Sequence, residues 1–168
     1  MITLMFTKSS SIGSVLIRWI SRSPVSHSVI GGLELCGVPV VIHASFGGVQ
    51  ISTMDEFLRH HTLVAEFALM PDVSQELQSA VRKIGQRYNY VGLFGYIPVL
   101  LGRWLKKKWS NPFRSAISTV CSEFIDSVLD DGKIPEMKDL VPSETTPNDL
   151  LDVCRANTGG SFAQIFPA

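Results

Sequence analysis

Short runs of strand-forming residues fill the first part of the chain, and helical patterns dominate the rest. The strand-like runs are residues 1–7, 26–31, 38–45, 49–51 and 63–70. A helix is predicted after Ser9–Ser11, a short one over 54–61, and longer ones over 73–88 and from Ser118 or Thr119 to Leu129. Strands grouped before helices favour an α+β fold with a mostly antiparallel sheet packed against helices.

The composition is that of a folded chain. Of the 168 residues, 45% are hydrophobic and 18% are charged, and the mean hydropathy is +0.21, which excludes a disordered protein. We expect a single domain over residues 1–155 and a loose tail over 156–168. Fifteen Lys and Arg residues balance fifteen Asp and Glu residues, so the net charge gives no support to a nucleic-acid partner.

Neither a secretory signal nor a membrane span is predicted. The N-terminus lacks a cationic start followed by an apolar core. The longest near-apolar run, residues 90–102, is too short to cross a bilayer as a helix. We therefore expect a cytoplasmic protein, or one released or virion-associated without a signal peptide. The sequence leaves the oligomeric state open.

The segment from Leu93 to Trp109 joins an apolar run to a basic end. Arg103 and three lysines at 106–108 follow the apolar residues, and tryptophans stand at 104 and 109. Such a segment could contact a membrane surface, with the cations towards anionic headgroups. The alternative is a buried helix with a solvated basic end.

Cys121 stands at the predicted start of an amphipathic helix whose apolar stripe includes Phe124, Ile125 and Val128. The first turn of a helix has unpaired N–H groups and a partial positive charge. Both favour the thiolate and can lower the pKa of a cysteine. The sequence therefore makes Cys121 a candidate nucleophile, although a small buried thiol is the plainer interpretation.

A nucleophilic cysteine needs a base, and two histidines lie on neighbouring predicted strands. In a hairpin centred on residue 35, His27 faces His43. A shift of two residues keeps both imidazoles on one face of the sheet, whereas a shift of one residue separates them. On one face they could act as a base and its orienting partner. The alternative is a pair of half-buried structural histidines.

These residues stand in a recognisable order. The segments, in chain order, are SxxSxxIRWISRSPVSHSVI, VVIHAS followed by a Gly-Gly turn, YNYVGLFGY, STVCSEFI and TPNDL. Together they resemble the circularly permuted NlpC/P60 group of papain-like enzymes, in which the histidine precedes the cysteine. That group is related to the lecithin:retinol acyltransferase superfamily. The resemblance covers about residues 6–151 and implies a permuted papain-like fold with a barrel-like sheet.

The resemblance also implies roles for residues. Cys121 matches the family nucleophile, His27 the base and His43 the third polar residue, which is often acidic in bacterial members and histidine in the acyltransferase relatives. Tyr88 and Tyr90 lie in a segment where a family tyrosine can help to position the thiol or the oxyanion. Packing is an equal interpretation for either tyrosine.

The implied activity is thiol-dependent hydrolysis of an amide bond in a peptidoglycan-type peptide, through a Cys-His-His triad and a thioester, with no cofactor. One alternative is a lipid acyl hydrolase or acyltransferase of the same superfamily, acting on a lipid-like acyl substrate. Another is a non-catalytic papain-like binding or structural module. His27, His43 and Cys121 could also hold zinc, but we favour a metal-free triad because no acidic partner for the ligands is evident.

The remaining thiols and imidazoles are weaker candidates. Cys36 lies in a predicted hairpin loop and Cys154 near the end of the last helix, so neither is expected to be catalytic. His60 and His61 are expected to face solvent. One of them could replace His43 as the orienting residue if the hairpin register differs.

Overall fold

The structure is a computed structural model. It describes residues 1–45, 47–88, 98–99, 101–102, 104–107, 109, 118–119, 121–129, 134–142 and 144–167. Its helices and strands are β1 (Thr3–Lys8), α1 (Ile12–Ser21), β2 (His27–Leu35), β3 (Val38–Ser45), β4 (Gly48–Thr53), α2 (Met54–His60), β5 (Thr62–Leu69), α3 (Ser74–Arg82), β6 (Arg87–Tyr88), β7 (Ser118–Thr119), α5 (Cys121–Leu129), a 3-10 turn (Pro135–Met137), α6 (Pro147–Ala156) and β8 (Phe162–Phe166).

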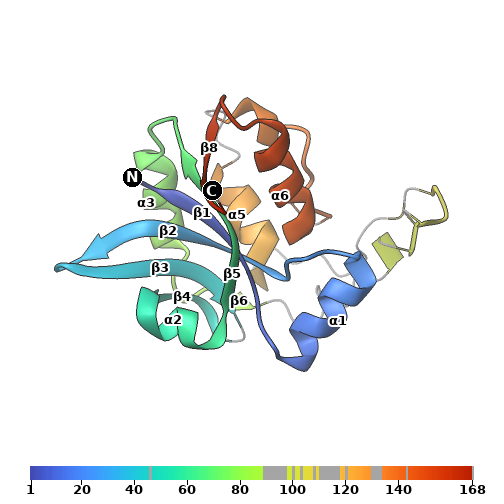
Figure 1. Ribbon diagram of the computed structural model, residues 1–168, viewed down its shortest axis with the longest axis horizontal. Helices are drawn as coiled ribbons and strands as arrows, with labels where there is room; N and C mark the ends of the chain where they lie inside the picture. Colours follow the sequence, from blue (N-terminus) through green and yellow to red (C-terminus); the bar gives the residue numbers. More distant parts are fainter. Residues whose placement is uncertain are drawn as a thin grey trace.

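A six-stranded antiparallel sheet in the order β4-β3-β2-β1-β5-β8 forms the centre of the molecule. Pairing within this sheet ends at β4 and β8, so the described strands form an open sheet, and the expected barrel is not shown. Figure 1 shows α5 and α6 on one side of the sheet and α2 against its lower edge. The predicted α+β class with a mostly antiparallel sheet is confirmed.

The two faces of the sheet bury separate apolar clusters. One face contributes Ile30, Ile42 and Ala44 to the larger cluster, which includes the apolar side of α5. The other face contributes Val29 and Val41 to a smaller cluster closed by Phe57 of α2. Odd-numbered residues of β2 near its start therefore point towards α2, and even-numbered ones towards α5.

The register of the β2–β3 hairpin changes along its length. At the turn Leu35 pairs with Val38 around a two-residue loop in which Cys36 and Gly37 both have positive φ. Between Ile30 and Leu33 a β-bulge places two residues of β2, Gly31 and Gly32, opposite one residue of β3. The bulge shifts the pairing by one residue, to Ile30 with Ile42. This register differs by two residues from a hairpin centred on residue 35 and turns His27 and His43 to one face.

Helix α3 is shorter than the apolar spacing predicts. It ends at Arg82, and Val81 and Ile84, which were expected on its buried stripe, are 50% and 38% exposed. Gly85 adopts a φ of 87°, and the backbone of Gly85 and Gln86 hydrogen-bonds to Val49 of β4. The chain thereby leaves the helix, and Tyr88 lies in β6 rather than at the end of a helix.

The C-terminal residues differ from the expected loose tail. Within residues 156–168, β8 pairs with β5 along the edge of the main sheet, with Phe162 fully buried. The pairing satisfies backbone groups of β5 that an edge strand would leave unpaired. Sequence pattern alone does not reveal this strand because its remaining side chains are partly or fully exposed.

None of the helices within the described part of the chain has the length and apolar character needed to span a bilayer. Of the segment from Leu93 to Trp109, residues 93–97, 100, 103 and 108 lie outside the described residues.

We predict that Gly32→Ala destabilises the fold, because Gly32 has a φ of 71° and an added Cβ would collide with the carbonyl oxygen of Met1. Left-handed strain plus the collision should lower the free energy of unfolding by about 3 kcal/mol. Gly159→Ala is the matched control, since Gly159 has a φ of 94° with no atom within 4 Å of an added Cβ. That control should lose only about 1 kcal/mol. Urea titration measures both values, and equal losses would show that the bulge tolerates a side chain.

Candidate functional site

Two buried imidazoles meet where β2 begins and β3 ends. His27 is 9% exposed and His43 is 4% exposed. The His27 Nε2 and His43 Nδ1 atoms are 3.4 Å apart, and the ring planes are perpendicular with centroids separated by 5.6 Å. The structure thus brings together the two histidines that the sequence paired.

The pair continues into polar side chains of β4. His43 Nε2 lies 3.1 Å from the Ser52 hydroxyl and 3.4 Å from the Gln50 side-chain nitrogen. The amide of Gln50 makes its shorter hydrogen bond, 2.9 Å, to the Ser45 hydroxyl. Each imidazole nitrogen of His43 therefore has a partner, whereas within the described part of the chain His27 is bonded through its Nε2 alone.

His61 joins this cluster, contrary to the expectation that it faces solvent. Its ring stacks on Phe57 at a centroid distance of 4.3 Å and lies 5.3 Å from the ring of His27. Its Nδ1 is 3.4 Å from the Thr7 hydroxyl. His60 is exposed, as expected. The sequence offered His60 or His61 only as a substitute for His43, because contacts among β1, α2 and β2 bring His61 to the pair.

Burial sets the charge of the imidazoles. Desolvation, followed by the neighbouring His43 and His61, lowers the pKa of His27 well below 6.5. Desolvation and then His61 lower the pKa of His43 to about 4. Both rings are therefore neutral at pH 7, and each can donate one hydrogen bond and accept another.

Cys121 is the first residue of α5, as predicted, and is 5% exposed. Its Sγ lies 4.0 Å from the carbonyl oxygen of Ser26. Hydrogen bonding to backbone groups, that of Ser28 foremost, favours the thiolate, but burial outweighs it and raises the pKa of Cys121 to about 11. The lowered pKa expected from the helix start is therefore not found, because desolvation dominates.

The thiol and the imidazoles approach β2 from different sides. Helix α5 covers the face that carries Ile30, whereas His27 lies on the face of Val29, next to Phe57. The hydrogen bonds recorded for the described residues join Cys121 to the backbone beside His27 and not to either imidazole. The structure thus places Cys121 and His27 at the same point of β2 without bringing their side chains together.

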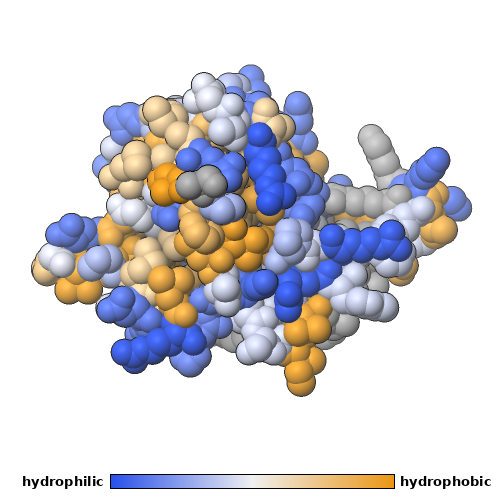
Figure 2. Space-filling model, viewed as in Figure 1, coloured by the Kyte–Doolittle hydropathy of each residue, from blue (hydrophilic) through white to orange (hydrophobic). Residues whose placement is uncertain are grey.

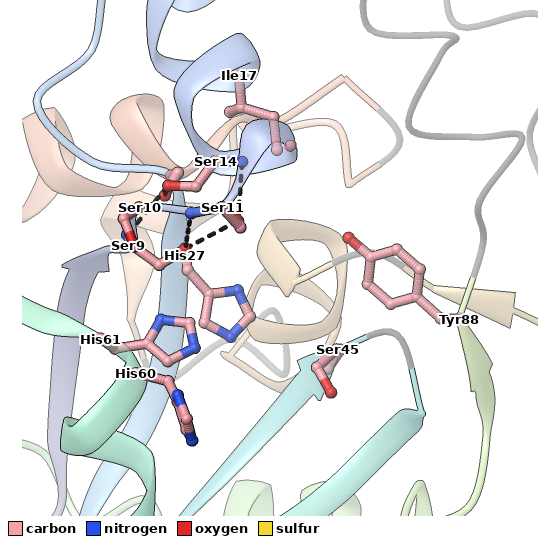
Figure 3. Close-up of a pocket in the computed structure, with 13 residues that line it drawn as sticks. Ser9, Ser10, Ser11, Ser14, Ile17, His27, Ser45, His60, His61 and Tyr88 are labelled. Carbon is pink, nitrogen blue, oxygen red and sulfur yellow. Dashed lines mark hydrogen bonds between the residues drawn. The ribbon is translucent and has the colours of Figure 1, made fainter.

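A cavity of about 390 Å³ opens at this end of the sheet. Figure 3 shows His27 and His61 on one wall, the start of α1 above them, and Ser45 and Tyr88 on the opposite side. Tyr88 thus borders the cavity, as a residue near a substrate would, whereas Tyr90 lies outside the described residues. Cys121 is not among the residues that line the cavity.

Polar groups of α1 form the roof of this cavity. Ser11 caps the helix by accepting a hydrogen bond from the Ser14 backbone, and Ser9 and Ser10 also line the cavity. The Ser14 hydroxyl lies 2.6 Å from that of Ser26, next to His27. The start of α1 is thus fixed to the start of β2.

The other cysteines lie away from the imidazole pair. Cys36 is exposed in the β2–β3 turn, and Cys154 is buried in α6 among apolar residues, where burial raises its pKa. Over the described ranges, no group of three or more His, Cys, Asp or Glu side chains is arranged to hold a metal ion.

Comparison with known proteins gives a structural likeness. No protein-family model matches the sequence. No curated protein matches it either. The fold is similar to the crystal structure of metalloprotein yiiX from Escherichia coli O157:H7, described as DUF1105, with a TM-score of 0.63 and 17% sequence identity. The match covers 97% of this chain and 94% of that one. At this identity the likeness concerns the fold alone.

We predict that acid destabilises the protein through His43. Its pKa is about 4 in the folded protein, against the ordinary histidine value of 6.5 in the unfolded chain, so only the unfolded chain takes up the proton between these values. The contribution is complete above about pH 6.5 and is lost as the pH falls towards 4, by roughly 3 kcal/mol.

Urea titration at several pH values measures this loss. His43→Gln removes the titrating group. Between pH 6.5 and 4 it should reduce the slope of the free energy of unfolding against pH by an amount equivalent to the uptake of up to one proton. Cys36→Ser, at an exposed position, is the control and should leave it unchanged. The same slope in His43→Gln as in the wild type would mean that this imidazole titrates alike in both states.

Proposed function

We propose that the protein is a thiol-dependent hydrolase that cleaves an amide bond, with Cys121 as nucleophile and His27 as base. One observation carries the proposal: the Cys121 sulfur contacts the β2 backbone on both sides of His27, through the Ser26 carbonyl and the Ser28 backbone. The Ser28 nitrogen is only two bonds from the His27 Cα, so the sulfur lies beside the backbone of the proposed base, and the reaction requires the His27 imidazole to turn towards it. The occupied Nε2 of His27 leaves Nδ1 as the proton acceptor.

The hydrogen bonds from His27 through His43 to Ser52 can run in either of two directions, and one of these directions supports the role of His27 as base. If the His43 Nε2–H donates to Ser52, then His43 Nδ1 accepts from the His27 Nε2–H. In this direction the Gln50 amide nitrogen, which can only donate, makes no hydrogen bond to His43 Nε2 and keeps its shorter one to Ser45. His27 Nδ1 then keeps its lone pair and can take a proton. In the opposite direction Nδ1 carries the proton and His27 cannot act as a base. His43 and Ser52 would therefore act as positioning residues that select the tautomer.

The reaction would proceed by acyl transfer. The thiol is protonated and both imidazoles are neutral at pH 7, so His27 Nδ1 takes the thiol proton as sulfur attacks the carbonyl carbon. The Cys121 backbone N–H, at the start of α5, is a candidate donor to the oxyanion. Collapse of the intermediate breaks the C–N bond, and the imidazolium protonates the departing amine. Water, deprotonated by His27, then hydrolyses the thioester.

The resemblance in the sequence extends this proposal to a permuted papain-like (NlpC/P60) fold and a peptidoglycan-type peptide. The order of His27, His43 and Cys121, the placement of Cys121 on a helix start and the cavity at the imidazoles support it. A histidine at position 43, as in the acyltransferase relatives, makes a lipid-like acyl substrate the alternative within this chemistry.

A second candidate is a non-catalytic papain-like binding module. The separation of the thiol from the imidazole pair and its raised pKa favour it. In this case the cavity binds a ligand, and Cys121 is a buried structural thiol.

We predict that a p-nitrophenyl acyl ester, a generic activated acyl donor, acylates Cys121 and releases a stoichiometric burst of p-nitrophenol. Mass spectrometry should place the acyl group on Cys121. Cys121→Ser should abolish the burst, His27→Gln should slow it by roughly 10²–10⁴-fold, and Cys36→Ser should behave as the wild type. A metal chelator should change nothing, because the proposed chemistry uses none.

The competing outcomes are distinct. A burst that survives Cys121→Ser, or acylation confined to the exposed Cys36, would contradict the hydrolase and favour the binding module. If Cys121 is acylated, the rates at which the protein hydrolyses muropeptides and lipid esters or amides distinguish the two substrate classes.

A further inference from the structure

Helix α1 exposes three of its large apolar side chains. Ile12, Val15 and Trp19 follow one another at helical spacing and are 89%, 48% and 73% exposed. Figure 1 shows α1 standing out at the lower right of the sheet, and orange side chains protrude from its free end in Figure 2. Three large apolar side chains on one helix face form an unpartnered surface rather than isolated exposures.

The side of α1 towards the cavity carries Gly13 and Ser14 together with half-buried Ile17. Among the α1 residues whose burial is described, Ser14 is the buried one, and it contacts Ser26 through its hydroxyl. The same side lines the cavity with Ser11 and Gly13. The helix therefore separates the cavity beside His27 from an apolar outer surface.

A second segment extends this surface. The guanidinium of Arg22, at the end of α1, lies 4.6 Å from the ring centroid of Trp104. Leu101, Trp104 and Leu105 are 41%, 48% and 59% exposed, and Trp109 is 42% exposed. In Figure 2 orange and blue side chains lie together at the far right edge, over this segment.

We call this region the tryptophan surface: Ile12, Val15, Trp19, Arg22, Leu101, Trp104, Leu105, Lys106, Lys107 and Trp109. It contains all three tryptophans of the chain. Their amphipathic rings favour the boundary between water and the acyl chains of a bilayer. The surface thus combines the residues that an interfacial membrane-binding site uses.

The distribution of charge points to an anionic partner. Residues 1–33 and 77–122 contain eleven of the fifteen Lys and Arg residues and none of the fifteen Asp and Glu residues. The tryptophan surface is drawn entirely from these two stretches. The zero net charge of the chain therefore conceals a separation of charge along the sequence, and the cations of the tryptophan surface, Arg22, Lys106 and Lys107, belong to stretches that contain no acidic residue.

We propose that the tryptophan surface docks on an anionic lipid bilayer, with the apolar side chains inserted between headgroups and Arg22, Lys106 and Lys107 against the lipid phosphates. The site is α1 together with the described residues of 101–109. It does not depend on catalysis by Cys121. Docking would place the cavity on the inner side of α1 one helix diameter from the bilayer.

Flotation of the full chain with vesicles tests the proposal. Phosphatidylcholine vesicles with about one third phosphatidylglycerol should bind the wild type, and added salt should weaken the binding. The emission of the three tryptophans should shift to the blue, since all of them lie on the surface. Ile12→Ser with Trp19→Ser should lower the partition coefficient at least about tenfold. Lys106→Glu with Lys107→Glu should do the same.

Matched variants control for hydrophobicity and charge. Leu35→Ser removes a 57% exposed apolar side chain at the distant β2–β3 turn. Lys138→Glu with Arg155→Glu makes the same change in charge at exposed positions outside the surface. Both controls, and Cys121→Ser, should bind as the wild type does, and circular dichroism checks that each variant folds.

Three outcomes would overturn the proposal. The first is no binding of the wild type to anionic vesicles. The second is binding that the control variants weaken as much as the surface variants do. The third is a wild type that self-associates and does not bind vesicles, while the double variant Ile12→Ser with Trp19→Ser is a monomer. That result would assign the surface to a second copy of the chain.

Discussion

Side chains on a β-strand alternate between the two faces of a sheet, so one extra residue decides which side chains can meet. The two-residue turn at Cys36 and Gly37 starts the β2–β3 hairpin in a register that would turn His27 and His43 to opposite faces. The bulge at Gly31 and Gly32 supplies the missing shift of one residue. The contact between the imidazoles, their shared burial and their lowered pKa values all depend on that shift.

Burial then determines what these groups can do at neutral pH. Each imidazole near His27 makes a second charge more costly, so the cluster is held neutral by desolvation and by mutual repulsion. The same desolvation keeps the Cys121 thiol protonated despite its position at a helix start. A preformed thiolate–imidazolium pair is therefore excluded in this conformation, and proton transfer has to accompany substrate binding. This condition separates the hydrolase from the binding module.

Local signals in the sequence were sufficient for the elements that carry their own caps. Ser11 begins α1, Thr53 begins α2 and Thr146 begins α6 with a capping box, all as expected from residue type. From the sequence, His27 and His43 could be placed on one face of the sheet only if the pairing of the two predicted strands had a suitable register. The bulge that meets this condition, the stacking of His61 on Phe57 and the pairing of β8 depend on contacts between distant segments, which periodicity does not encode.

Helix α1 shows that a sequence pattern can predict a helix correctly without identifying what the apolar side of that helix contacts. Apolar spacing predicted the helix, and the usual inference is that the apolar side faces the core. Here the cavity takes up that place, and Ser14, the capping serines and Ile17 lie beside it. The apolar side is then left outward, beside Trp104 and the lysines that follow it. A helix with this polarity has to be explained together with what it faces on both sides: the cavity beside His27 within the molecule and, in our proposal, an amphipathic boundary outside.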